Sequence, residues 1–284
     1  VNFNKPFTLK EVTIEENQES LAEAVAINVI RKINDVVVVT PFSLASTVIL
    51  LSSVKGFTMD AVQKNMELLF DYCKFAGVPT SEALDEKANM DEIIQYVVDS
   101  FKEDHIIDEL NEEEAEESSV EDLYLLPEDE RPRIVFYKNS IIHYFLPMSF
   151  ASLSLLTVED ENITLNEQPK EVFRLYSRLI QEYFESYLVV FDSIVKTRQG
   201  KQQKKEFILD LRKNGIRMYH TGEIHLAESL SMPNYQNAMN MLRSRKIIVE
   251  EYVNKRNIVL DIENPGAVEP LREEVIKYLG FIHQ

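Results

Sequence analysis

The stretch "IVFYKNSIIHYFLPMSF", residues 134–150, decides the fold class, because it is long and apolar apart from a few polar positions. Its apolar residues recur at helical spacing, which predicts a helix over Tyr137–Leu156. On that helix Asn139 and His143 lie four positions apart and share a face, whereas Lys138 lies about 100° away and can reach solvent. We therefore interpret the stretch as a buried or membrane-facing helix and not as an active site.

The composition also favours helices. The chain of 284 residues has 7 glycines and no tryptophan, and its length allows one large domain or two. A single cysteine, Cys73, excludes a disulfide framework and fits a reducing compartment. The sequence opens without a signal-peptide pattern and without an initiator methionine, so we expect a piece of a longer protein.

Helical periodicity continues on both sides of the opening stretch. Upstream it predicts helices over 15–34, 58–76 and 89–101, the second capped by Thr58 and closed by Gly77. A stretch of nineteen residues without a charge, 36–54, just reaches the length of a membrane span. Because it contains Pro41 and six serines or threonines, a buried helix beginning near Thr40–Pro41 is the better interpretation.

The last third of the chain mixes helices with turn signals. After a helix over 169–188, the sequence predicts a helix closed by Asn214–Gly215 and then two short strands around Thr221–Gly222. Residues 235–262 repeat this order, and both copies contain L-R-x-x-x-I where the helix should meet the strand. We therefore predict a mostly α (α+β) fold with two small helix-plus-β-hairpin units in the C-terminal third.

Breaks in these patterns suggest four segments. Residues 1–12, "VNFNKPFTLKEV", alternate like a strand leaving a sheet, and 13–104 form a helical subdomain. Residues 105–133 are an acidic linker, and 134–284 form a C-terminal helical subdomain with two β-hairpins.

The charges are unevenly distributed. A net charge of −18 and a pI of about 4.8 argue against binding of nucleic acid or anionic membranes by the protein as a whole. Basic residues nevertheless gather between residues 196 and 256. The first part of this segment supplies our candidate anion-binding residues, which are Lys201, Lys204, Lys205, Arg212, Lys213 and Arg217. A surface that is charged only for solubility is the alternative.

Motifs of catalysis and of cofactor binding are missing from the sequence. None of the five histidines is followed by aspartate five positions on, as the His-x4-Asp dyad of acyltransferases requires. No phosphate-binding or dinucleotide-binding glycine motif is present, so we expect no cofactor. The string "HTGEIH" offers His220, Glu223 and His225, but no fourth ligand follows, and we expect no metal there.

Several strings resemble one enzyme family in the order in which that family has them. "FYKNSIIHYFLPMSFASLSLL" resembles the Y-x-x-N-x-x-x-H-x-F segment in the C-terminal half of glycerol-3-phosphate acyltransferases. The matching positions here are Phe136 or Tyr137, Asn139 or Ser140, His143 and Phe145. Residues 40–79 resemble the helix pair that follows the catalytic core in that family. The opening "VNFNKP" is similar to its V-N-F-G-E-P strand, with Asn4 and Lys5 in place of Gly-Glu.

The resemblance implies that residues 1–12 are the last strand of an acyltransferase domain and that the rest is the C-terminal domain. The whole enzyme would transfer an acyl group from acyl-carrier protein or coenzyme A to the 1-hydroxyl of glycerol 3-phosphate, which begins phospholipid synthesis. The catalytic dyad would lie before Val1, so we expect this chain to be inactive alone.

The same resemblance suggests roles and partners. The basic residues would steer the acyl donor or contact the membrane, and Tyr137, Asn139 and His143 would pack against the N-terminal catalytic domain. The protein would lie peripherally on the cytoplasmic face of the inner membrane, without nucleic acid. Two alternatives remain open: a winged-helix-like nucleic-acid-binding domain and a domain that serves only as a scaffold.

Overall fold

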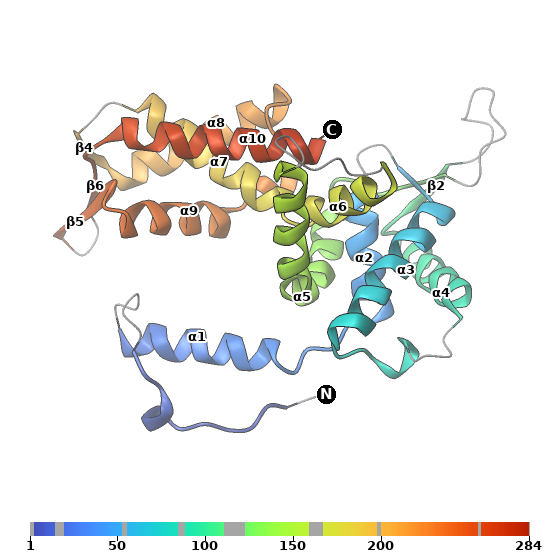
Figure 1. Ribbon diagram of the computed structural model, residues 1–284. Coiled ribbons are helices and arrows are strands. Elements are labelled where there is room, and N and C mark those ends of the chain that lie inside the picture. The colour runs from blue at the N-terminus through green and yellow to red at the C-terminus, as the bar shows by residue number, and fades with distance from the viewer. Residues whose placement is uncertain are drawn as a thin grey trace. The chain divides into compact units, whose positions relative to one another are not determined.

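The computed structural model describes residues 3–14, 20–52, 56–84, 89–110, 123–158, 167–197, 200–254 and 257–283 (Figure 1). The chain divides into two compact units, Val1–Leu146 and Pro147–Gln284, and the division falls within one long helix. The described residues are mostly helical, with two small antiparallel sheets of three strands each. The prediction of a mostly α fold with some β structure is therefore confirmed.

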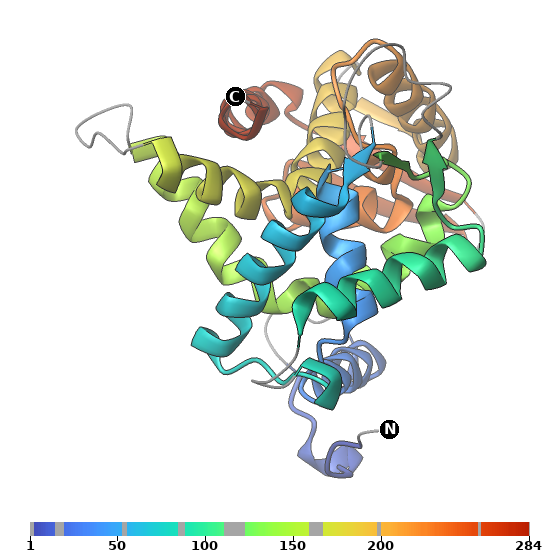
Figure 2. The same ribbon diagram turned by 90° about the vertical axis from the view of Figure 1, so that its right-hand side faces the viewer.

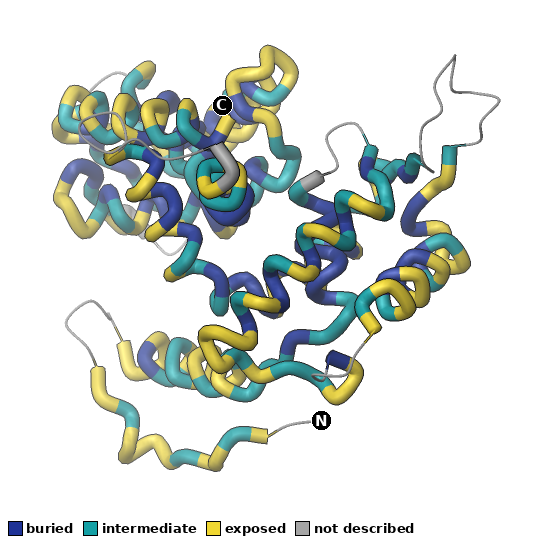
Figure 3. The backbone as a smooth tube through the Cα atoms, turned by 45° about the vertical axis from the view of Figure 1, so that its right-hand side comes forward, coloured by how far each residue is buried: buried dark blue, intermediate teal, exposed yellow. Residues whose placement is uncertain are grey.

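The first unit is a group of helices around one apolar helix. Its α-helices and 3-10 helices are η1 (Leu9–Glu11), α1 (Leu21–Asn34), α2 (Pro41–Ser52), α3 (Met59–Ala76), η2 (Glu82–Leu84), α4 (Met90–Glu103) and the first part of α5 (Arg131–Val158). Helices α3 and α4 pack on α2 and on each other (Figure 2). Most of α2 is buried, whereas α1 is largely exposed (Figure 3). Residues 41–52 of the charge-free stretch are thus a core helix of this unit, as predicted.

Helix α3 ends where the sequence places its caps. The Thr58 side chain accepts a hydrogen bond from the Ala61 N–H, and Gly77 closes the helix with a left-handed φ of 66°. Residues Val62, Met66, Leu69, Phe70 and Cys73 form its buried stripe. Cys73 is a core residue of this helix, since its side chain is fully buried.

Both sides of the predicted acidic linker contain a short strand. Within residues 105–133, strands β2 (Asp108–Leu110) and β3 (Leu123–Leu125) pair with each other in antiparallel orientation. Strand β3 also pairs with β1 (Phe57–Thr58), so the sheet order is β1-β3-β2. Apolar residues flanking the acidic run, such as Ile107 and Tyr124, are buried and hold its ends to the unit. Residues 111–122, the centre of the predicted linker, lie outside the described residues.

The predicted opening strand is not formed by residues 3–12. They run without strand pairing into η1, and Asn4 donates from Nδ2 to the backbone oxygen of Lys32 at 2.9 Å, beside α1. A strand needs a neighbouring strand for its backbone hydrogen bonds, and the described residues provide none here.

The second unit is built around helix α7 (Gln181–Lys196), whose residues are buried on nearly every side. Helices α8 (Lys204–His220), α9 (Met232–Ser244) and α10 (Glu269–His283) contact it (Figure 1). The unit also contains α6 (Glu167–Arg178), η3 (Ala227–Leu230), η4 (Pro265–Val268) and the strands β4 (Gly200–Gln203), β5 (Ile248–Asn254) and β6 (Asn257–Ile262). The strand order is β4-β6-β5, and the β5–β6 hairpin confirms the second predicted hairpin.

The first predicted hairpin is wrong, because α8 continues through Asn214–Gly215 to His220. Its buried residues Phe207, Leu211, Gly215 and Met218 follow one helical stripe, so the apolar period does not stop at the Asn-Gly pair. Thr221–Gly222 is indeed a turn, but it is the turn that closes the helix. The N–H groups of Gly222 and Glu223 donate to the carbonyls of Tyr219 and Met218, as in a Schellman motif.

The structure also divides the helix predicted over 169–188. Helices α6 and α7 are separated at Leu179–Ile180, where the N–H groups donate three residues back and not four. Both of these residues are buried, which keeps the apolar pattern unbroken across the division. The spacing of apolar residues indicates which residues are buried and not where a helix is interrupted, so it did not reveal this break.

Candidate functional site

The six candidate anion-binding residues lie on β4 and α8 of the second unit, and most of them are paired with carboxylates of the same unit. Lys201 on β4 lies 2.6 Å from a carboxylate oxygen of Glu251, and Lys204 lies 2.8 Å from one of Glu250. The Glu250 side chain is only 5% exposed, so Lys204 neutralises a nearly buried charge. These two lysines therefore hold α8 and β4 to the β5–β6 hairpin.

Two further bases on α8 are also paired. Lys213 lies 3.0 Å from Asp210 on the same helix. Arg217 forms a short ion pair with Glu223 and also lies 3.7 Å from the buried Asp192 on α7. The hydrogen bond from Arg217 is the main cause that lowers the pKa of Glu223. Carboxylates of the same unit largely neutralise these bases, so the bases are weaker candidates for binding an external anion.

Lys205 and Arg212 differ from the other four. Both are exposed, and in the part of the chain that the structure describes no carboxylate lies within ion-pair distance of either. Arg212 donates from Nε to the sulfur of Met232 at 3.2 Å. Positions 205, 209, 212 and 216 follow one face of α8, and the other two are the apolar residues Leu209 and Ile216.

Leu209 and Ile216 are 48% and 50% exposed and lie on the same face of α8 as two exposed cations. Together with Lys205 and Arg212 they form what we call the α8 face, a surface that is both cationic and apolar. Sequence reasoning found the two bases but missed the two aliphatic residues. The spacing i, i+4, i+7, i+11 from Lys205 to Ile216 was the signal that could have found them.

The residues predicted for packing against a catalytic domain lie on α5 in the first unit. Asn139 is exposed and Tyr137 is 38% exposed, with its ring against Phe42 and Phe136. Lys138, which could have reached solvent, is buried instead. The helix begins at Arg131 and turns the side chain of Lys138 toward the core.

His143 is half-buried beside Tyr144, with ring centroids 4.0 Å apart. Burial lowers the pKa of His143, although a hydrogen bond with the Asn34 carbonyl and the charge of Asp35 act in the opposite direction. The neighbouring hydroxyl of Tyr144 lies 3.0 Å from the Asn34 oxygen and 2.7 Å from the Val37 oxygen. The α5 residues around His143 therefore fix the end of α1, a structural role that the sequence did not indicate for Tyr144.

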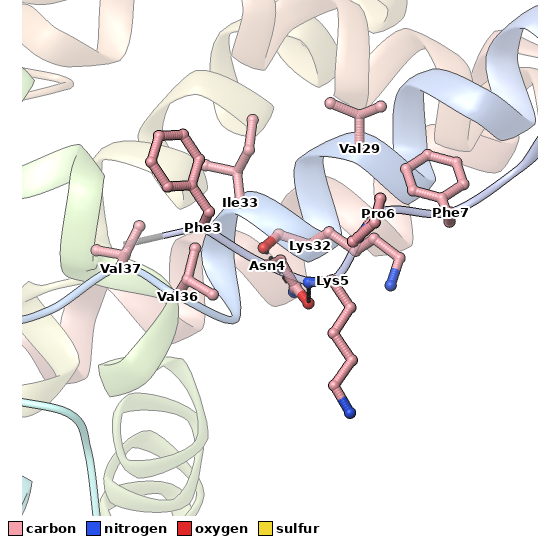
Figure 4. A pocket seen from close by; sticks show the side chains of 10 residues that line it. All are labelled: Phe3, Asn4, Lys5, Pro6, Phe7, Val29, Lys32, Ile33, Val36 and Val37. Carbon is pink, nitrogen blue, oxygen red and sulfur yellow. Dashed lines mark hydrogen bonds between the residues drawn. The ribbon is translucent and has the colours of Figure 1, made fainter. Parts of the chain in front are cut away.

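An apolar hollow of the first unit lies between the N-terminal segment and α1 (Figure 4). It has a volume of about 500 Å³, and its walls are mainly apolar. Its lining residues are Phe3, Asn4, Lys5, Pro6, Phe7, Val29, Lys32, Ile33, Val36 and Val37. Phe3 is 87% exposed and Ile33 is 55% exposed, so this apolar surface continues beyond the hollow.

The three candidate ligands in "HTGEIH" do not come together. Glu223 binds Arg217 and the Thr221 hydroxyl, whereas His225 lies beside Glu185 and His283. The described residues include one helix, α5, that is long and apolar enough to cross a membrane by length and composition. Its buried residues include Ile134, Ile141 and Phe145.

The features that carry the resemblance thus lie in a helical unit whose core includes α2, α3 and α5, with a small α+β unit after it. The chain matches the family model of the glycerol-3-phosphate acyltransferase C-terminal region over residues 1–176 and 154–251. These matches include most of the sequence, and the chain therefore belongs to this family.

Proposed function

We propose that this chain is a non-catalytic domain of a glycerol-3-phosphate 1-O-acyltransferase that holds the enzyme at an anionic membrane surface. The reaction itself takes an acyl group from acyl-carrier protein or coenzyme A to the 1-hydroxyl of glycerol 3-phosphate, at the start of phospholipid synthesis. The family assignment supports the reaction, and the absence of a His-x4-Asp dyad from this sequence supports a non-catalytic role. The purified chain should therefore transfer no acyl group alone.

The α8 face is the observation that carries the proposed membrane contact. Anionic lipid attracts Lys205 and Arg212, and the apolar part of the membrane interface accepts Leu209 and Ile216. One helix face therefore supplies both the electrostatic and the apolar contribution to membrane binding. Coenzyme A, a polyanionic small molecule, would need the cations but not the exposed aliphatic residues. The other four bases are already paired with carboxylates, so they favour neither ligand.

The binding free energy expected from the α8 face fits peripheral attachment to a membrane. Each unpaired cation near an anionic surface is worth about 1 kcal/mol. Burial of the exposed halves of Leu209 and Ile216 adds about 1 kcal/mol each, since a full aliphatic side chain is worth about 1.5–3 kcal/mol. The sum of about 4 kcal/mol corresponds to about a thousandfold enrichment. That is reversible binding, opposed by the net charge of −18 and weakened by salt.

Vesicle sedimentation tests this proposal with the whole chain. We expect binding to vesicles that contain phosphatidylserine or phosphatidylglycerol, little binding to phosphatidylcholine alone, and a steep loss as salt rises. Lys205→Glu with Arg212→Glu, or Leu209→Glu with Ile216→Glu, should each reduce binding about 30-fold or more, from the loss of about 2 kcal/mol. Equal binding by these variants and the wild type would refute the membrane contact.

A matched control lies on another helix of the same unit. Ile276 on α10 is 42% exposed and Lys277 follows it, so Ile276→Glu with Lys277→Glu makes the same kind of change away from the α8 face. This variant should bind vesicles like the wild type. Reversal of Lys201 or Lys204 is a poor test, because the new carboxylate would face Glu251 or Glu250 and disturb the hairpin.

The same proteins distinguish the other hypotheses. A change of KM for the acyl donor in the full enzyme, with unchanged vesicle binding, would assign the α8 face to acyl-carrier protein or coenzyme A. Salt-dependent binding of a DNA duplex would favour a nucleic-acid-binding domain. If the variants change neither vesicle binding nor the KM for the acyl donor, and no DNA binds, the scaffold function remains, in which the domain has no ligand of its own.

We place the contact with the N-terminal catalytic domain on the exposed apolar surface of α1 and the N-terminal segment. Phe3, Ile30 and Ile33 are each more than half exposed there, and the hollow between the segment and α1 continues this surface. Ile33→Asp in the full enzyme should lower specific activity without unfolding this domain. Phe75→Asp, at an 86% exposed residue of α3, is the control that should leave activity unchanged.

A further inference from the structure

A carboxylate lies in the centre of the second unit, where burial would normally oppose its charge. Glu185 is on α7, and its side chain is fully buried. Its Oε2 atom accepts hydrogen bonds from the Leu226 N–H at 3.0 Å and from the Ser229 hydroxyl at 2.7 Å. These donors fix the orientation of the carboxylate and direct Oε1 toward a different set of neighbours.

Two histidines face that second oxygen from distant parts of the chain. His225 Nδ1 lies 3.6 Å from Glu185 Oε1, and His283 Nε2 lies 3.7 Å from the same atom. The two imidazole rings are 4.2 Å apart between centroids. One ligand atom from each of the three residues lies within 4.8 Å of the others. The loop after α8 and the end of α10 thus meet on α7.

Gln181 shows what kind of group this arrangement attracts. Its Nε2 atom lies 2.8 Å from Glu185 Oε1 and 3.0 Å from His283 Nε2. An amide nitrogen only donates, so this contact is a hydrogen bond in the His283 tautomer that has its lone pair on Nε2. In that tautomer, lone pairs of Glu185 and His283 converge on a positively polarised group, which is also the requirement of a cation.

We propose that Glu185, His225 and His283 bind one Zn²⁺ ion. Two imidazoles and one carboxylate are a common zinc ligand set, and ligand atoms at about 2.0–2.1 Å in a tetrahedron lie about 3.4 Å from one another. The distances of 3.6 and 3.7 Å from Glu185 Oε1 are close to that spacing, and all three ligand atoms lie within 4.8 Å of one another, so the ion needs the site to contract and the Gln181 amide to rotate out of the way. This inference does not depend on the proposed membrane function.

The surroundings fit a bound ion in two further respects. The side chains of His225 and His283 are 46% and 31% exposed, which gives zinc a path from solvent and leaves a fourth position for water. The donors on Glu185 Oε2 act as the outer shell that orients a metal-binding carboxylate. Zinc would therefore join α7, the loop after α8 and the C-terminal end of α10.

Titration of the whole chain, without a histidine tag, with zinc chloride tests the proposal. We expect one ion per chain by calorimetry, a rise in the unfolding temperature of the second unit, and reversal by a chelator. Co²⁺ should bind in its place and give visible absorption of a four-coordinate site. Magnesium should not compete, because it requires an octahedron of oxygen ligands.

Two variants and one control decide the outcome. His225→Ala and His283→Ala remove exposed ligands, leave the hydrogen bonds of Glu185 Oε2 intact, and should each weaken zinc binding about 100-fold or more. His220→Ala, at an exposed histidine of α8 outside the cluster, should bind zinc like the wild type. Absence of zinc binding by the wild type, or equal binding by all three variants, would overturn the proposal.

Discussion

Substitution of Gly215 by alanine should destabilise the second unit, although the same change usually stabilises a helix. Gly215 is a buried residue in the interior of α8. A Cβ atom at this position would lie 2.4 Å from the hydroxyl oxygen of Tyr235, 3.1 Å from Leu230 Cδ2 and 3.3 Å from Val189 Cγ1. The first distance is a direct overlap, and the Tyr235 side chain is only 1% exposed, so it has little room to move.

The expected size follows from two opposing terms. Alanine is favoured over glycine in a helix interior by about 1 kcal/mol. Overpacking of a dense core costs about 1–3 kcal/mol, and an overlap with a buried ring belongs at the upper end. Gly215→Ala should therefore lower the free energy of unfolding by about 2 kcal/mol. In a unit of this size that corresponds to a fall of about 6 °C in the unfolding temperature.

Differential scanning calorimetry on this variant and its controls measures the effect. Gly280→Ala on α10 is the matched control, since an added Cβ there meets nothing within 4 Å, and it should stabilise by up to about 1 kcal/mol. The hydroxyl of Tyr235 is buried without a hydrogen-bond partner among the described residues, so Tyr235→Phe alone should be neutral or stabilising. Added to Gly215→Ala, it should remove most of the destabilisation.

Gly215→Ala, Tyr235→Phe and the double variant form a double-mutant cycle that can refute this packing argument. If Gly215→Ala raises the unfolding temperature as Gly280→Ala does, the close approach of α8 to Tyr235 is not a packing constraint. If Gly215→Ala costs the same in the wild-type protein and in the Tyr235→Phe variant, the coupling energy is zero and the hydroxyl overlap is not the cause of the destabilisation.

Three further predictions concern a helix cap and two buried groups. Thr58→Ala removes the cap of α3 and should destabilise the first unit by about 1 kcal/mol in urea unfolding. Cys73 is fully buried, and burial raises its thiol pKa to about 12, so a thiol reagent should label it only as the first unit opens. Burial tends to raise the pKa of Asp192, but hydrogen bonds from Lys196 and Asn214 lower it overall, so its stabilisation is present at neutral pH. That stabilisation should be lost in acid, as pH falls from about 4 through the lowered folded-state pKa, and Asp192→Asn should flatten this part of the stability profile.

The elements that the sequence predicted correctly are those whose signals are local. Helix α3 was delimited by Thr58 and Gly77, because a capping hydroxyl and a left-handed glycine act within one turn of the helix. The hairpin of β5 and β6 was also recognised, since two strand patterns flank a short polar turn. In both cases the residues that determine the structure are neighbours in the sequence.

The elements that the sequence predicted wrongly are those determined by contacts between residues far apart in the sequence. Asn214–Gly215 resembles a helix end, but the Asn214 amide donates to Asp192 and Ser193 of α7, and Gly215 makes room for Tyr235 of α9. Both residues are explained by helices that lie about 20 positions away in the sequence, as the separations of 22 and 21 for the Asn214 bonds indicate. The two L-R-x-x-x-I strings likewise take different structures, so they are not evidence of a duplicated unit.

The candidate sites were the least predictable part, because each depends on contacts between distant segments. Glu185 and His283 are separated by about a hundred positions, and no spacing rule joins them to His225. Of the three candidate ligands in "HTGEIH", only His225 belongs to this cluster, because the fold separates residues that are close in sequence. Metal-binding residue types can be counted in a sequence, but their convergence on one point depends on the packing of α7, α8 and α10.

The α8 face illustrates why the count of basic residues was also a poor guide. The carboxylates of the helix, Glu206 and Asp210, lie about 100° and 140° around it from Lys205, so they can neutralise bases on the flank but not on the face itself. Lys213 is accordingly paired with Asp210, while Lys205 and Arg212 have no such partner among the described residues. Folding thus offsets the bases on the sides of α8 and leaves two cations beside two exposed aliphatic residues. A protein with a net charge of −18 can approach an anionic surface only through such a local separation of charge, which is why the proposal depends on these four residues and not on the basic segment as a whole.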